Sequence, residues 1–233
     1  MATSPTLRLV RDELYGFARS KVMLVLWVIL PAIAIVGYLL FKDNAQLNGG
    51  LGEDHQLSAN TFMSLILSSL SGTIAALMVA VDIVSERQRK VYELYVIRPI
   101  RREAIIWAKF IAVFLCVTIA CVVSIALGIA VDTVRGDPFN ATIAFDALKA
   151  LSQLTCVVGL SAAVGVLFGV ISRTIVVAVL LILYGGQNLT IVPMIPTYFG
   201  VLPDQFWVFQ LVSVLMIVAL TWLAMVIFRR SQF

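Results

Sequence analysis

The stretch from Ser85 to Phe110, SERQRKVYELYVIRPIRREAIIWAKF, gathers basic and acidic residues between two long apolar runs. The chain around it has 233 residues, of which 61% are hydrophobic and 13% charged, and its mean hydropathy is +1.01. An ordinary soluble domain is roughly half apolar and about a quarter charged. The composition therefore indicates an integral membrane protein, in which so charged a stretch lies outside the bilayer core.

Six apolar runs are long enough to cross a bilayer, which takes about 20 helical residues. They are Val22–Phe41, Thr61–Val84, Phe110–Val131, Ala150–Ile171, Thr174–Ile195 and Phe206–Phe228. The linkers between them are too short for a second domain. The sequence therefore predicts an all-α integral membrane fold with six transmembrane helices, forming a single transmembrane domain over residues 1–233.

The basic residues predict the orientation of these spans. With the N-terminus in the cytoplasm, all but three of the 17 Lys and Arg residues fall on the cytoplasmic side, the exceptions being Lys42, Arg135 and Lys149. Lys and Arg concentrate in the cytoplasmic loops of membrane proteins. We therefore expect a multi-pass protein of the plasma membrane, the inner membrane in a bacterium, with both termini cytoplasmic. The positive net charge follows from this topology and predicts no nucleic-acid partner.

An amphipathic helix is predicted within residues 1–21, ahead of the first span. Leu7, Val10, Leu14 and Phe17 follow one another at helical spacing, and most of the charged residues lie elsewhere around the helix. Such a helix lies at the membrane interface with its apolar face inward. It serves either as a membrane anchor or as a contact for a partner, and the sequence leaves both interpretations open.

The second span is rich in small residues, which let two helices approach closely. They are Ser64, Ser68, Ser69, Ser71, Gly72, Ala75 and Ala76. We expect this face to pack against another helix or against a second copy of the chain, in preference to lining a polar pathway.

The opening stretch also has the pattern of a short amphipathic helix. Val91, Leu94 and Tyr95 share one face, and Pro99 ends the helix. Topology alone would account for the Arg and Lys residues, but it leaves the interleaved Glu residues and the apolar stripe unexplained. A helix with both signs of charge and an apolar stripe suits the docking of a protein partner.

The charged stretch and the residues just before it carry a resemblance to a known family. The order Asp82, Glu86, Arg89, Glu93-Leu94, Pro99, Arg101-Arg102 and Lys109 resembles the cytoplasmic signature between spans two and three of ABC-2 type transporter permeases. The N-terminal sequence RDELYGFARSKVMLVLWVILP resembles the opening of the same family, so the resemblance covers the whole chain. One departure is Lys90-Val91, which stands where the family usually has Gly-Thr.

The resemblance implies the permease subunit of an ABC exporter, working as a homodimer or heterodimer in membrane lipid. Segment 85–103 would be the coupling helix, seated in a groove on a separate ABC ATPase. The implied docking residues are Glu86, Arg89, Val91, Glu93 and Leu94, with Pro99, Arg101 and Arg102 fixing the following turn. The chain has no G-x-x-x-x-G-K-[ST] loop, so ATP and Mg would bind to the partner and this chain would carry no cofactor.

No enzyme site is predicted. Ser161 lies two residues after Gly159 in span four, but the single histidine, His55, lies in the first outer loop and cannot serve it as a base. Cys116, Cys121 and Cys156 lie in apolar runs without the spacing of a metal site. We therefore expect a non-catalytic membrane protein with no metal site.

Three intramembrane polar residues have two interpretations each. Asp82, near the cytoplasmic end of span two, is either the coupling carboxylate of a proton-driven secondary carrier or a partner of Lys109 or a nearby Arg; we favour pairing because charge costs less near the interface. Lys109 itself can snorkel to the headgroups. Gln187 and Asn188 either line an outer gate or satisfy the helical backbone broken near Gly185. A non-transporting assembly subunit is the third alternative for the whole chain.

Overall fold

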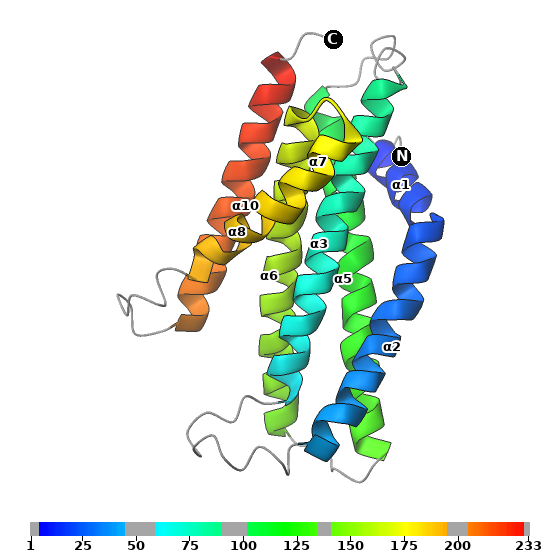
Figure 1. Cartoon of the computed structure of the whole chain (residues 1–233), viewed down its shortest axis with the longest axis vertical. Helices are drawn as coiled ribbons and strands as arrows, with labels where there is room; N and C mark the ends of the chain where they lie inside the picture. The colour runs from blue at the N-terminus through cyan, green and yellow to red at the C-terminus, as the bar shows by residue number, and fades with distance from the viewer. Residues whose placement is uncertain (1–4, 45–58, 90–101, 135–140, 195–204, 231–233) are drawn as a thin grey trace.

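The computed structural model describes residues 5–44, 59–89, 102–134, 141–194 and 205–230, and within these ranges the regular elements are all helices. The long helices run side by side along one axis (Figure 1). The elements are α1 (Pro5–Ala18), α2 (Lys21–Asn44), α3 (Ala59–Gln88), α5 (Arg102–Val134), α6 (Ala141–Ile171), α7 (Ile175–Leu181), a π-helical turn (Ile182–Gly186), α8 (Gln187–Ile191), a 3₁₀ turn (Val192–Met194) and α10 (Gln205–Arg230). The predicted all-α class is confirmed.

Four of the described helices are long and apolar enough to cross a membrane, by the segments Ile66–Gln88, Ala104–Val131, Ala147–Ile171 and Phe206–Arg230. A fifth candidate combines Leu9–Ala18 with Lys21–Gly37, which meet at a bend of 62°. The predicted span Thr174–Ile195 corresponds to a shorter apolar stretch, Ile175–Thr190, interrupted by the π-helical turn. The structure thus supports a multi-pass helical protein with four or five spans, and the sixth stays a prediction.

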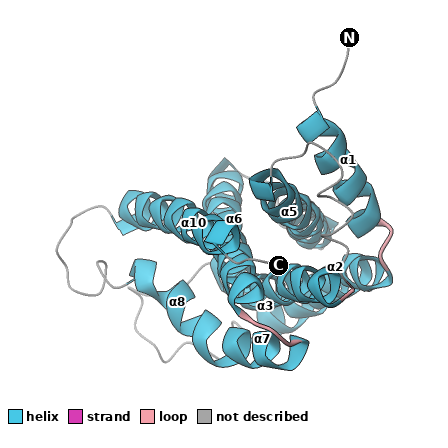
Figure 2. Cartoon of the chain, turned by 90° about the horizontal axis from the view of Figure 1, so that it is seen from above, coloured by secondary structure: helices cyan, strands magenta, loops and turns pink. Residues whose placement is uncertain are grey.

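Helix α6 lies at the centre of the bundle. It packs against α3, α5 and α10, while α2 and α1 lie against α5 (Figure 2). The apolar segment of α6 is 72% buried, whereas that of α10 is only 22% buried. Helix α10 is therefore a peripheral element with most of its apolar surface facing outward.

Helices α3 and α6 meet through small side chains spaced four residues apart. On α6, a Cβ added to Gly165 would lie 2.4 Å from the carbonyl oxygen of Ala76, and one added to Gly169 would lie 2.9 Å from the Cα of Ala80. The two backbones are thus in direct contact, which only small residues permit. We call this contact the small-residue seam, formed by Gly72, Ala76 and Ala80 of α3 and Ser161, Gly165 and Gly169 of α6. The small face of the second span packs within the chain, as one of the two expected arrangements.

Charged side chains collect at one end of the bundle. Helix α1, residues 82–88 of α3 and residues 102–109 of α5 lie together there, and the C-terminal end of α10 is at the same end (Figure 1). We call this region the charged end. It is also the end at which α3 leads toward residues 90–101.

Candidate functional site at the charged end

Lys109 is the centre of the charged end. Helix α5 begins at Arg102, earlier than the predicted start of the span at Phe110, so Lys109 lies about two turns inside a continuous helix. Its side chain is only 1% exposed. The expected snorkelling of this side chain to the headgroups is wrong, because its ammonium group finds carboxylates inside the protein.

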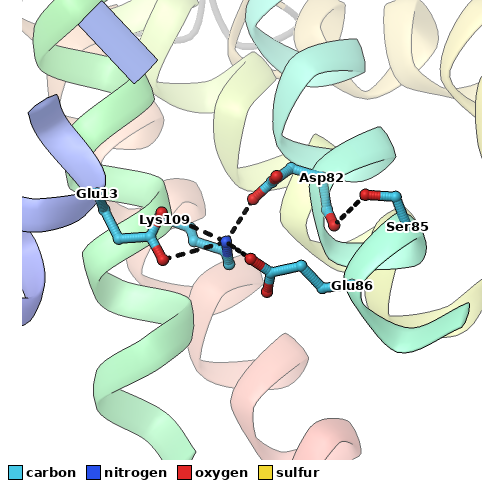
Figure 3. A network of polar contacts seen from close by, with 5 residues as sticks. All are labelled: Glu13, Asp82, Ser85, Glu86 and Lys109. Atoms are coloured by element: carbon cyan, nitrogen blue, oxygen red, sulfur yellow. Dashed lines mark hydrogen bonds and ion pairs between the residues drawn. The ribbon is translucent and has the colours of Figure 1, made fainter. Parts of the chain in front are cut away.

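Three carboxylates surround the ammonium group of Lys109 (Figure 3). Its Nζ lies 2.7 Å from Oε1 of Glu86 and donates a still shorter hydrogen bond to Asp82. The third carboxylate belongs to Glu13 of α1, whose two oxygens lie 3.2 and 3.4 Å from Nζ. We call these four side chains the Lys109 cluster. It joins α1, α3 and α5.

Helical spacing explains how the sequence brings these groups together. Asp82 and Glu86 are four residues apart and therefore share one face of α3. Glu13 lies four residues after Leu9 and four before Phe17, two apolar side chains of α1 that pack into or against the hydrophobic core. The apolar face of α1 thus delivers Glu13 to the bundle, and the Phe17 ring lies 6.0 Å from the Lys109 ammonium.

The hydrogen bonding of Lys109 is complete. An ammonium group has three N–H donors, and here three carboxylates can each accept one of them. One oxygen of Glu86, Oε2, is buried without a hydrogen-bond partner among the described residues. Lys109 is buried and its three carboxylates are partly buried, so removing this cation leaves negative charge uncompensated at a cost of several kcal/mol. Lys109 is therefore a strong structural determinant of this end.

Arg87, which follows Glu86 in the last turn of α3, joins that turn to α6. Its guanidinium donates hydrogen bonds to the carbonyl oxygens of Ser172 at 3.1 Å and Val170 at 2.8 Å, at the end of α6. The last carbonyl groups of a helix have no partner within it, and a basic side chain can satisfy them. The last turn of α3 is thus bonded to Lys109 of α5 on one side, and through Lys109 to Glu13 of α1, and to the end of α6 on the other.

Two residues of the predicted site, Asp82 and Glu86, pair with Lys109 of the same chain. Asp82 pairs with Lys109, which confirms the favoured interpretation, and the proton-coupling role stays a prediction. Glu86 was expected to contact an ATPase, but its carboxylate turns to Lys109. Its contact with a partner therefore stays a prediction without structural support.

The predicted segment 85–103 is only partly described. Its first residues, through Gln88, belong to α3 and not to a separate helix, because the helical hydrogen bonding of the span continues into them. Arg89 is exposed in the turn that follows, and Arg102 is the first residue of α5, with a side chain outside the described part. The remaining predicted docking and turn positions lie outside the described residues: Val91, Glu93, Leu94, Pro99 and Arg101.

Asn188 lies after the π-helical turn and supports its backbone. Its side-chain nitrogen donates a hydrogen bond to the carbonyl oxygen of Tyr184 at 2.8 Å. This confirms the backbone-satisfying interpretation for Asn188, in a segment whose helical hydrogen bonding changes at Ile182–Gly186. The side chain of Gln187 lies outside the described part of the structure.

The sequence pattern did not predict a site role for two residues of the charged end, Glu13 and Arg87. Glu13 was treated as one of the charged residues of an interfacial helix, although its spacing from Leu9 and Phe17 places it on the inward face. Arg87 was treated as a topology signal, and its capping of α6 depends on a turn distant in sequence. The first could have been found from helical spacing, the second only from the fold.

The bundle and its charged end define the class of this protein, a helical multi-pass membrane protein. Comparison of the sequence with known families then identifies the family. The chain belongs to the ABC-2 family transporter proteins, whose family model matches residues 42–230. No curated protein matches the chain. The resemblance drawn from the motif between spans two and three is confirmed, and the chain is a membrane component of the ABC-2 transporter family.

Proposed function

We propose that this chain is the permease subunit of an ATP-driven ABC exporter. A separate ABC ATPase binds ATP and Mg and docks on segment 85–103, and its closure moves the helices of the permease. The observation that carries the proposal is the anchoring of the last turn of α3, which forms the beginning of this segment and leads into residues 90–101. Glu86 ties that turn to Lys109, and Arg87 ties it to α6.

The anchoring gives a physical route for the coupling. A force on residues 90–101 reaches the last turn of α3 through the chain itself. From there, buried ion pairs and charge-assisted hydrogen bonds pass it to α1, α5 and α6, since such contacts hold their geometry better than exposed ones. The ATPase thereby acts on several helices at once.

In this proposal, the ATPase is contacted by two charged side chains, Arg89 and Glu93, and two apolar ones, Val91 and Leu94. Pro99, Arg101 and Arg102 fix the turn that follows. Two permease copies, identical or homologous, form the membrane part of the transporter. Both termini are cytoplasmic, and the membrane is the plasma membrane, the inner one in a bacterium. The cargo is a hydrophobic or amphipathic molecule moved outward.

The test is purification of the tagged chain in mild detergent together with the candidate ATPase. Glu93→Arg adds a third basic group beside Arg89 and Lys90 on the docking segment. We expect it to weaken ATPase binding at least roughly tenfold, or about 1.4 kcal/mol. The matched control is Glu53→Arg, the same change in the first outer loop of the predicted topology, which should leave binding unchanged.

Each outcome is informative. Weakened binding with Glu93→Arg alone supports docking on the segment. Equal binding of both variants contradicts the docking surface. Failure of any ATPase to bind the unaltered chain, while the permease remains folded, contradicts the ATP-driven assignment itself.

A further inference from the structure

Glu13 contributes the longest of the three carboxylate contacts to Lys109. Its oxygens lie 3.2 and 3.4 Å from Nζ, compared with 2.7 Å for Glu86 and less for Asp82. Glu13 is also the member of the cluster that comes from the peripheral helix α1 (Figures 2 and 3). It is thus the contact that a small displacement weakens first.

The electrostatic interactions within the cluster also indicate that Glu13 is its most weakly held carboxylate. Asp82 and Glu86 are like charges four residues apart on one helix, and they repel one another unless a cation lies between them. Lys109 occupies that position. Each of the three carboxylates is attracted to the ammonium and repelled by the other two, and the attraction is weakest for Glu13 because its oxygens lie farthest from Nζ. Asp82 and Glu86 can hold α3 to α5 without it.

Helix α1 is a separate element, joined to α2 by a short bend. The helix ends at Ala18, and the chain turns by 62° before α2 begins at Lys21. A swing of α1 relative to α2 would take place at this bend, where the N–H of Ser20 donates to the carbonyl oxygen of Phe17 at 3.0 Å and the Ser20 hydroxyl accepts from the N–H of Met23 at 3.2 Å. What opposes the swing is the Glu13 contact together with apolar side chains such as Leu9 and Phe17.

We propose that Glu13 is a releasable latch, which fastens α1 to the α3 and α5 pair through Lys109 and can open while Asp82 and Glu86 keep that pair joined. Glu86 shares the ammonium with Glu13 and lies in the last turn of α3, at the beginning of segment 85–103. A shift of that turn therefore changes the electrostatic hold on α1. The use of the latch in transport rests on the proposed function, whereas the latch itself is a property of this chain alone.

The test uses the purified full chain in lipid nanodiscs, with hydrogen exchange across α1 and the thermal unfolding midpoint as paired readouts. Glu13→Gln keeps the shape of the side chain and removes its charge. We expect about fivefold faster exchange over Leu9–Ala18, with the midpoint and the exchange of α3 and α5 unchanged. The matched control is Asp12→Asn, the same charge removal at an exposed position of the same helix, which should change neither readout.

Two results overturn the proposal. If Glu13→Gln lowers the midpoint and speeds exchange in α3 and α5, as Lys109→Met should, Glu13 is an integral part of the cluster and not a latch. If its exchange over α1 equals that of Asp12→Asn, the contact does not hold the helix. Neither readout needs an ATPase, so a failure of ATPase binding would count against the proposed function and leave this result standing.

Discussion

The small-residue seam and the Lys109 cluster both hold α3 in place, by opposite means. In the seam, Gly165 brings the α6 backbone against the carbonyl oxygen of Ala76, with no side chain between them. In the cluster, the long side chain of Lys109 reaches carboxylates on two other helices. One contact depends on the absence of atoms and the other on charge.

The difference follows from the surroundings of each region. Within the bilayer, lipid tails are as apolar as Leu side chains, so helices associate by close packing more than by the hydrophobic effect. Near the interface, charges cost less and can be satisfied by one another. A seam of this kind permits little movement, whereas an ionic cluster with unequal contacts can rearrange. Four substitutions test this contrast, given from the largest expected effect to the smallest.

Lys109→Met should cause the greatest loss of stability. It leaves Glu13, Asp82 and Glu86 facing one another without a cation, at a cost of about 3–5 kcal/mol in the free energy of unfolding. Unfolding of the purified chain in detergent measures it. The control is Lys149→Met, which removes an exposed lysine of α6 and should have little effect. Similar losses for the two variants would show that the cluster contributes no more than a surface charge.

Gly165→Ala should follow. The new Cβ would lie 2.4 Å from a backbone oxygen that cannot move independently of α3, so the two helices must separate. Overpacking of this kind costs roughly 3 kcal/mol, measured by the same unfolding experiment. Gly16→Ala is the control: no atom lies within 4 Å of its Cβ, and the change should stabilise α1 by up to about 1 kcal/mol. A neutral Gly165→Ala would refute direct backbone contact in the seam.

Arg87→Gln tests the place where the two regions meet. It removes the charge from the two hydrogen bonds to Ser172 and Val170 and should cost about 2 kcal/mol, with faster hydrogen exchange at the end of α6. Arg89→Gln, the same change at an exposed position two residues further, is the matched control when no ATPase is present, and it should leave the end of α6 unchanged. Unchanged exchange at the end of α6 would contradict the capping role.

Gly72→Ala should have the smallest effect, although it belongs to the same seam. Its added Cβ would lie 2.7 Å from Oγ of Ser161, a side chain that can rotate away. We expect a cost below about 1 kcal/mol in the unfolding experiment. A loss as large as that of Gly165→Ala would mean that the seam tolerates no side-chain rearrangement, and the distinction between backbone and side-chain contacts would fail.

Much of the fold could be predicted because it depends on local pattern. The apolar runs place α3, α5, α6 and α10, and the pairing of Asp82 with Lys109 followed from two opposite charges near the same interface. Helix bounds were less predictable, since charged residues such as Glu86 and Arg102 continue a helix as readily as they leave it. The irregular segment after Ile182 was expected from its glycines, but not its π-helical form.

The sequence by itself determined that this is a helical membrane protein of the ABC-2 family, because apolar length and the charged motif between spans two and three are properties of contiguous residues. Only the tertiary structure decided that Glu13 joins Lys109 and that Arg87 caps α6. Those contacts depend on the relative rotation and depth of separate helices, which no local pattern specifies. The small-residue seam fixes them for α3 and α6, and the packing of Leu9 and Phe17 against the core fixes them for α1.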